Sequence, residues 1–458
     1  SLSLALIGVG HLVGITVGIA MIVGLLISFG VMLPLRTAGQ IPAGGDLGEI
    51  VSRIFSSDVR FVGAGAMAVA AVWTLAKIAL PIARGVKEAL AATRARDEGE
   101  DVPVHERDLS MRVVAGVTLA SMLPIGLLLW LFVRDTPIGH HAVGMVVVSI
   151  LFVLLIGLAV AGVCGYMAGL IGASNSPISG VGILIVIAAA LLIKVVHGAQ
   201  APGQGDALIA YTLFTAAVVF GVATISNDNL QDLKTGQLVG ATPWKQQVAL
   251  VVGVAFGSLI IPPVLQLLNT SFGFAGAPEA TDNALAAPQA ALLSSLAKGV
   301  FGGDLSWGLL GLGAAIGVVV VVVDEVLGLA TKNRMHLPPL AVGMGMYLPM
   351  GLTLIIPVGA VAGLLYDRWA AGTADPESTR RLSTLAATGL IVGESLFGVV
   401  LAGIVAASGE EDPLAVVGSG FTTVSEALGA LVFAGMTLGL YLWVRRLSVR
   451  ATGARTRA

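Results

Sequence analysis

Charged residues are scarce in this sequence. Only 52 of its 458 residues are charged, 27 Asp or Glu and 25 Lys or Arg, whereas a soluble domain carries about a quarter. Aromatic residues make up 5% and Gly occupies 60 positions, so the 56% of hydrophobic residues comes mainly from Ala, Val, Leu and Ile. Small residues permit the close helix packing found in bilayers. This composition excludes an ordinary soluble enzyme and predicts an all-α, polytopic transmembrane helical bundle.

Cysteine and the common cofactor motifs are almost absent. The single Cys164 excludes an internal disulfide and a cysteine-based metal site. The sequence contains no GxxxxGK[ST] phosphate loop and no HExxH, and its six histidines have no metal-ligand spacing. A net charge of −2 without a long basic tract argues against a nucleic-acid partner. We therefore expect neither a resident cofactor nor a metal site.

Apolar runs of roughly 20 residues, the length that crosses the hydrocarbon core, are frequent. They predict eleven spans, at residues 4–35, 61–82, 112–133, 142–164, 181–196, 207–225, 248–270, 305–330, 338–366, 384–407 and 421–444. If residues 338–366 cross an even number of times, 18 of the 25 basic residues fall on one side, which is then cytoplasmic. This predicts a multi-pass protein of the cell inner membrane, with a cytoplasmic loop at 83–111 and a cytoplasmic C-terminal tail at 445–458.

The stretch 338–366 differs from the other runs because it holds four prolines and four glycines, among them Pro349. Interior prolines remove backbone hydrogen bonds, so we expect broken half-helices or a re-entrant hairpin. Such backbone lines binding sites in transporters, and Met344 and Tyr347 then become candidates for a site wall. A proline-kinked packing helix, with methionines as filler, is the alternative.

Two polar stretches interrupt the apolar runs. The first, at 165–184, is uncharged and offers amide, hydroxyl and backbone groups to a solute, although the same residues also form tight turns; its candidate residues are Asn175, Ser176, Pro177, Ser179 and Gly180. The second, at 226–247, is predicted to be a hydrophilic cytoplasmic loop, with a short helix capped by Asn227 or Asp228. It contains Asp228, Asp232 and Lys234.

These stretches occur in a specific order. NSPISG (175–180) and DLKTGQLVGATPWKQQ (232–247) are followed by NRMHLPPLAVGMGMYLPMGLTLIIPVGAVAG (333–363) and GESLFGVVLAG (393–403). Together they resemble the oligopeptide transporter family, which includes the yellow stripe-like metal-chelate carriers. The resemblance covers residues 110–445 and implies one transporter domain over 1–458, part of a longer fold of about sixteen helices in two pseudo-symmetric halves. It further implies proton-driven import of short oligopeptides or metal chelates, and an N-terminal part that precedes this sequence.

Carboxylates inside apolar runs are functional candidates because burying a charge in a bilayer is costly. Glu394 lies near the middle of the run 384–407, beside Ser395, and is the first candidate for proton coupling or substrate contact. Asp324 and Glu325 interrupt a run of valines and form a second pair of candidates. A structural carboxyl that accepts hydrogen bonds from backbone donors, or that pairs with a basic group, is the alternative in each case.

Two other function classes stay open at this point. A membrane-embedded, ion-pumping phosphohydrolase also needs many helices, but it requires clustered carboxylates for Mg²⁺ and phosphate; here only Asp228 and Asp232 have i,i+4 spacing. A channel is the third possibility. The expected partners are the lipid bilayer, protons and a small-molecule substrate. Gly-rich helix faces are also compatible with a homo-oligomer.

Overall fold

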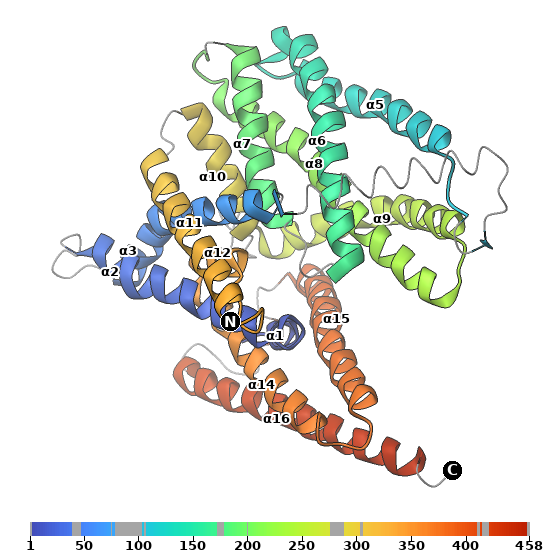
Figure 1. The fold of residues 1–458 in the computed structure, drawn as a ribbon. Coiled ribbons are helices and arrows are strands. Elements are labelled where there is room, and N and C mark those ends of the chain that lie inside the picture. The colour runs from blue at the N-terminus through green and yellow to red at the C-terminus, as the bar shows by residue number, and fades with distance from the viewer. Residues whose placement is uncertain are drawn as a thin grey trace. The chain divides into compact units, whose positions relative to one another are not determined.

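Helices account for the regular structure of the described residues (Figure 1). The computed structural model describes residues 2–38, 47–74, 76–77, 103–104, 107–171, 178–198, 200–274, 288–302, 306–409, 413–414 and 421–455. Eleven helical stretches in these ranges are long and apolar enough to cross a membrane, which confirms the predicted polytopic all-α class. The chain divides into two compact units: unit 1 comprises residues 1–63, 261–287 and 319–458, and unit 2 comprises residues 64–260 and 288–318.

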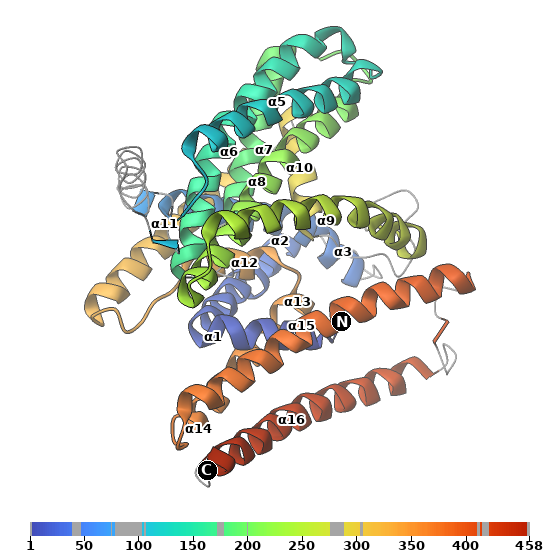
Figure 2. The same cartoon turned by 90° about the vertical axis from the view of Figure 1, so that its right-hand side faces the viewer.

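Unit 1 contains the N-terminal helices and the C-terminal third of the chain. Its elements are α1 (Leu4–Leu25), η1 (Leu26–Met32), α2 (Leu33–Thr37), α3 (Leu47–Ile54), η2 (Phe55–Val59), α12 (Pro339–Tyr347), α13 (Met350–Thr353), α14 (Ile355–Ala370), α15 (Pro376–Ser408) and α16 (Thr422–Arg455). Within this unit α1 packs on α14, α12 and α15. Figure 2 shows α15 and α16 as two long helices.

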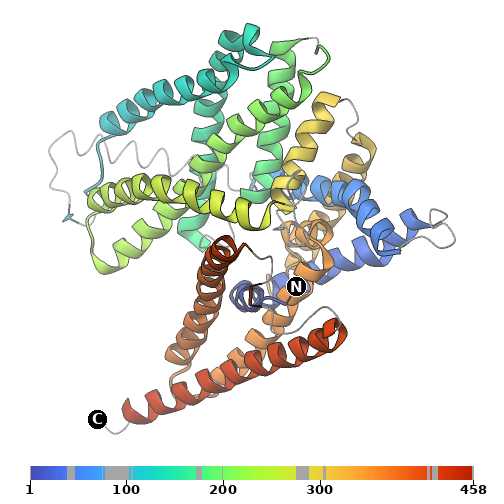
Figure 3. The ribbon, with the colours of Figure 1, turned by 180° about the vertical axis from the view of Figure 1, so that it is seen from behind.

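Unit 2 is built around α6 (Ala142–Ile171), α7 (Ile178–His197) and α8 (Gly205–Val239), which pack side by side (Figure 3). Around them lie α5 (Met111–Arg134), η4 (Gly139–His141) and α10 (Pro288–Gly302). The ammonium group of Lys194 on α7 donates a hydrogen bond to the carbonyl of Val300 on α10. Helices α9 (Pro243–Phe272) and α11 (Trp307–Ala330) each contribute residues to both units.

Local sequence determines where several helices begin and end. The side chains of Ser3 and Asp375 accept hydrogen bonds from the backbone amides of Leu6 and Ser378, and so cap the N-termini of α1 and α15. Gly240 and Gly409 follow α8 and α15 with φ of 72° and 70°, a left-handed conformation that glycine adopts without strain. These two glycines explain why α8 and α15 end where they do.

One sequence prediction needs correction, and two others are only partly described. The segment 226–239 is not a loop: α8 continues through it, and Asn227 is a buried residue inside this helix rather than the cap of a short one. The predicted tail at 445–458 is helical as far as Arg455, because α16 continues past the apolar run. Most of the predicted loop 83–111 lies outside the described residues.

Candidate functional site

The predicted break in the stretch 338–366 is present. Helix α12 ends at Tyr347 and is nine residues long, about 14 Å, which is less than half of the hydrocarbon core. Leu348 and Pro349 are extended, with ψ of 146° and 144°, and α13 and α14 follow. The buried hydroxyl of Thr353 lies 3.2 Å from the carbonyl oxygen of Leu348 and 3.1 Å from that of Pro349. The break is thus an ordered structure, in which the Thr353 hydroxyl donates to the carbonyl groups of Leu348 and Pro349.

A second break lies in α1 and was not predicted. Gly14 has φ 79° and ψ 174°, which interrupts the helix between Val13 and Ile15. This region of backbone conformation is essentially restricted to glycine. No described atom lies within 4 Å of the position that a Cβ on Gly14 would occupy. The interruption therefore faces open space rather than a packed neighbour.

The two interrupted helices pack against each other through glycines. A Cβ added to Gly10 or Gly24 of α1 would lie 2.0 Å from the carbonyl oxygen of Ile356 or 2.1 Å from that of Val342. In the other direction, a Cβ on Gly345 or Gly359 would lie 2.3 Å from the carbonyl oxygen of Met21 or Ile7. Small residues permit this backbone contact. The contacts run antiparallel, so the first half of α1 lies on α14 and the second half on α12.

Arg60 and Tyr347 meet beside the break in α12–α14. The guanidinium carbon of Arg60 lies 5.2 Å from the ring centroid of Tyr347, within the range of a cation–π contact. Gly63, one turn further along the helix of residues 60–74, lies against the backbone of Tyr347. Tyr347 is 2% exposed, and the Nε of Arg60 is buried without a hydrogen-bond partner among the described residues. Sequence reasoning missed Arg60 because it counted this residue only as a loop charge.

The other residues predicted to bind substrate lie in different parts of the chain. Met344 and Pro349 lie at the same break and are half-buried. Gly180 is buried at the start of α7 in unit 2, and the backbone of Ser179 belongs to the same helix. Asn175, Ser176 and Pro177, like the side chain of Ser179, lie outside the described residues.

Glu394 lies in the middle of α15 and contacts the beginning of α1. Its Oε1 accepts a hydrogen bond from the Ser3 hydroxyl at 2.6 Å, and its Oε2 accepts one from the Ala5 amide at 2.9 Å. The first amides of a helix have no partner within the helix, so this carboxylate completes the N-terminus of α1. Ser395 donates to the carbonyl of Ile391 on its own helix at 2.9 Å. These two hydrogen bonds support the alternative that Glu394 is a structural carboxylate. Its role in proton coupling stays a prediction.

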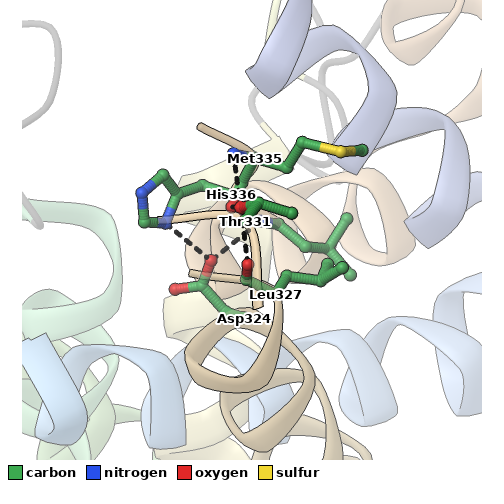
Figure 4. A network of polar contacts seen from close by, with 6 residues as sticks. Asp324, Leu327, Thr331, Met335 and His336 are labelled. Atoms are coloured by element: carbon green, nitrogen blue, oxygen red, sulfur yellow. Dashed lines mark hydrogen bonds and ion pairs between the residues drawn. The ribbon is translucent and has the colours of Figure 1, made fainter. Parts of the chain in front are cut away.

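Asp324 likewise binds backbone. Its Oδ1 accepts from the Leu337 amide at 2.8 Å and lies 3.4 Å from Nδ1 of His336 (Figure 4). The intervening turn contains Lys332 and Asn333 at positive φ, 53° and 60°, and the Thr331 hydroxyl accepts from the Met335 amide. Asp324 therefore fixes the connection that leads from α11 into α12. Glu325, the next residue, is half-buried on α11.

The predicted cytoplasmic motif lies on the polar C-terminal part of α8 in unit 2. Asp228 and Asp232 are exposed on α8, one turn apart, and Lys234 donates to Gln237 Oε1 at 3.0 Å. The turn 240–242 leads directly into α9, and the Ala241 amide donates to the carbonyl of Gly236 at 2.8 Å. A groove of about 570 Å³ next to this turn includes Asp232 in its wall.

Histidines occupy two places that the sequence does not mark. In unit 1, Nδ1 of His11 lies 2.9 Å from the Tyr441 hydroxyl. In unit 2 the rings of His140, His141 and His197 lie together, with centroids 4.7 to 6.1 Å apart. Even so, no group of three or more His, Cys, Asp or Glu residues in the described ranges is arranged to hold a metal ion.

Comparisons with known proteins identify a family of membrane transporters. The family described as OPT oligopeptide transporter protein matches residues 1–405. A Haemophilus influenzae protein named "Putative oligopeptide transporter" is 38% identical over 463 residues, which cover 97% of this chain and 72% of that protein. "Probable metal-nicotianamine transporter YSL10" of rice is 29% identical over 206 residues, which cover 44% of this chain and 28% of that protein.

A second plant relative, "Probable metal-nicotianamine transporter YSL5" of Arabidopsis thaliana, is 24% identical over 214 residues, 44% of this chain and 28% of that protein. No solved structure matches the chain. The resemblance inferred from the ordered motifs is confirmed by the family match over residues 1–405 and by the Haemophilus relative. This chain is a multi-pass membrane protein that belongs to the oligopeptide transporter family.

Proposed function

We propose that this protein imports short oligopeptides or metal chelates across the cell inner membrane by proton-coupled secondary active transport. The observation that supports it most directly is the pair of interrupted helices in unit 1, α1 at Gly14 and α12–α14 at Leu348 and Pro349. Non-helical backbone at membrane depth is tolerated where protein buries it or where it lines a water-filled cavity. In secondary transporters such interruptions accompany substrate and ion sites near the midplane.

Substrate chemistry gives Arg60 a role at this site. Peptides carry a C-terminal carboxylate, and the chelator named for the plant relatives is also a carboxylate compound. Arg60 is the cation beside the break, held over the Tyr347 ring with its Nε unpaired among the described residues. A guanidinium matches a carboxylate in a two-point contact. We infer that Arg60 binds the substrate carboxylate, with Tyr347, Met344 and Pro349 forming the adjacent wall.

The first polar stretch, which belongs to unit 2, is a separate part of the proposal. Asn175, Ser176, Pro177, Ser179 and Gly180 precede or begin α7 and supply uncharged hydrogen-bonding groups. Asp228, Asp232 and Lys234 belong to the proposed cytoplasmic face, as does the C-terminus. Alternating access then exposes the site first to one side and afterwards to the other.

The test uses the full chain in proteoliposomes under an inward proton gradient. Radiolabelled tetra-alanine and nickel–nicotianamine serve as probes, each in competition with the other. Proton-coupled import predicts saturable accumulation that collapses when a protonophore is added. Uptake of both probes that is non-saturable or insensitive to the protonophore refutes the proposal, and the non-saturable case indicates a channel.

The Arg60→Gln variant tests the carboxylate contact. Losing a charge-assisted hydrogen bond costs about 1.5–3 kcal/mol, so the apparent affinity for either probe should fall roughly tenfold to a hundredfold. Arg36→Gln is the matched control, because Arg36 already pairs with Asp58 at 3.7 Å in the same unit. Equal effects of the two substitutions would contradict a specific role for Arg60.

A further inference from the structure

His11 occupies a closely fitted site in unit 1, three residues before the Gly14 break. Besides its 2.9 Å contact with the Tyr441 hydroxyl, its ring centroid lies 5.7 Å from that of Tyr441 and 6.5 Å from that of Tyr366. Gly363 makes room for the imidazole: a Cβ there would lie 2.9 Å from its Nδ1. The ring therefore joins α1 to α14 and α16.

The ionisable groups around His11 come from three helices. Helix α14 contributes Tyr366 and Asp367, and the Asp367 carboxylate interacts electrostatically with both His11 and Tyr441. Helix α16 contributes Tyr441 and also Arg445, whose guanidinium lies 4.9 Å from the Trp369 ring.

The remaining neighbours of α1 bring their ionisable groups to other positions. Glu394 of α15 binds the first turn of α1 at Ala5, six residues or roughly 9 Å along the helix from His11. Helix α12 packs on the later part of α1, around Met21 and Gly24, and its Tyr347 lies against Arg60. Among the described residues, Asp367 is thus the acidic group that is available to balance a charged His11.

We propose that His11 takes up and releases the proton that drives transport, an inference that rests on the proton coupling proposed above. An O–H bond of a hydronium ion breaks and an N–H bond forms at the ring nitrogen that carries no hydrogen, which leaves a water molecule and turns the neutral imidazole into an imidazolium; release reverses the step. Neutral His11 accepts from or donates to the Tyr441 hydroxyl, depending on its tautomer, whereas the imidazolium only donates. Protonation therefore fixes the direction of this hydrogen bond and places a positive charge beside Asp367.

The position of His11 places this charge between two of the interrupted helical segments, α1 and α14. Its ring contacts belong to both interrupted helices, because α1 carries His11 and α14 carries Tyr366 and Gly363. A groove of about 510 Å³ between α14 and α16 has Tyr366 and Tyr441 in its wall, together with Trp369 and Arg445. The groove thus gives the rings that hold His11 an opening to the outside of unit 1. A proton bound there shifts the balance between two arrangements of α1, α14 and α16.

The experiment compares two transport modes of the full chain in proteoliposomes, with tetra-alanine and nickel–nicotianamine as probes. His11→Gln keeps a hydrogen-bonding side chain beside Tyr441 but does not titrate near neutral pH. We expect this variant to lose gradient-driven accumulation at least tenfold and to retain counterflow exchange, which needs no proton gradient. Tyr441→Phe keeps His11 and should remain proton-coupled with a shifted pH dependence. His140→Gln, in unit 2, is the matched control and should behave as the wild type.

The outcomes separate the inference from the proposed function. If the wild type accumulates neither probe in response to the gradient, the proposed function fails. If the wild type is coupled and His11→Gln is equally coupled, the role of His11 is refuted while the proposed function stands. Loss of counterflow together with accumulation in His11→Gln assigns the residue a structural role and also refutes the inference.

Discussion

The Gly14→Ala substitution tests the break in α1 most directly. Gly14 has φ 79° and ψ 174°, a conformation that costs a residue with a Cβ about 1–3 kcal/mol. In a straight helix the same substitution gains about 1 kcal/mol. Added together, these terms shift the balance from the broken to the straight form of α1 by roughly 2–4 kcal/mol, or about thirtyfold to a thousandfold.

Steric damage does not complicate this substitution, because no described atom lies within 4 Å of the new Cβ. We therefore expect a folded protein in which uptake falls by at least tenfold, measured as initial rates in proteoliposomes beside thermal unfolding in detergent. Gly116→Ala is the control, since Gly116 lies inside α5 with the same open space around it among the described residues. Wild-type uptake by Gly14→Ala would show that transport does not need the break.

The remaining predictions concern packing and hydrogen bonding in unit 1. Gly10→Ala places a Cβ 2.0 Å from the Ile356 carbonyl oxygen and should lower the free energy of unfolding by about 1–3 kcal/mol through overpacking, as measured by thermal denaturation; unchanged stability would refute the tight contact. Thr353→Val removes the donor near the Leu348 and Pro349 carbonyls and should cost about 1–3 kcal/mol in the same assay, with no loss expected if water replaces the hydroxyl. Glu394→Gln weakens two hydrogen bonds to the start of α1, so hydrogen exchange at Ala5 should accelerate roughly tenfold while the pH dependence of uptake stays unchanged; a loss of that dependence would assign coupling to Glu394 instead of His11.

The spans were predictable because crossing a bilayer requires a long apolar run, and such runs are visible in the sequence. The break after Tyr347 was also predictable, since Pro349 cannot continue a regular helix. The end of α8 was not: polar residues such as Asn227 and Asp228 indicate solvent, but a helix continues into water as readily as it ends there. Polar residues therefore show where the apolar span ends, but they do not show where the helix ends.

The break at Gly14 and the role of Glu394 depend on contacts that a linear pattern does not contain. Helix α1 holds many glycines, and most of them serve close packing; the backbone angles alone distinguish Gly14. Glu394 was singled out because a carboxylate lies in an apolar run, but its partner is the start of a helix almost four hundred residues away in the chain. The sequence does not mark His11, because an isolated histidine belongs to no motif. Its significance comes from its contact with the Tyr441 hydroxyl on α16.

The distribution of these glycines also indicates where unit 1 can bend. On both sides of Gly14 the backbone of α1 touches that of its partner helices, at Gly10 on one side and at Gly24 on the other. Such direct backbone contacts resist sliding of one helix along the other, because a displacement brings closely packed backbone atoms into collision. We therefore expect the pieces of the interrupted helices to move as paired blocks, with the backbone rotation of a change of access concentrated at Gly14 and at Leu348–Pro349. His11 lies three residues before Gly14, so a charge added there is expected to act next to the first of these two breaks.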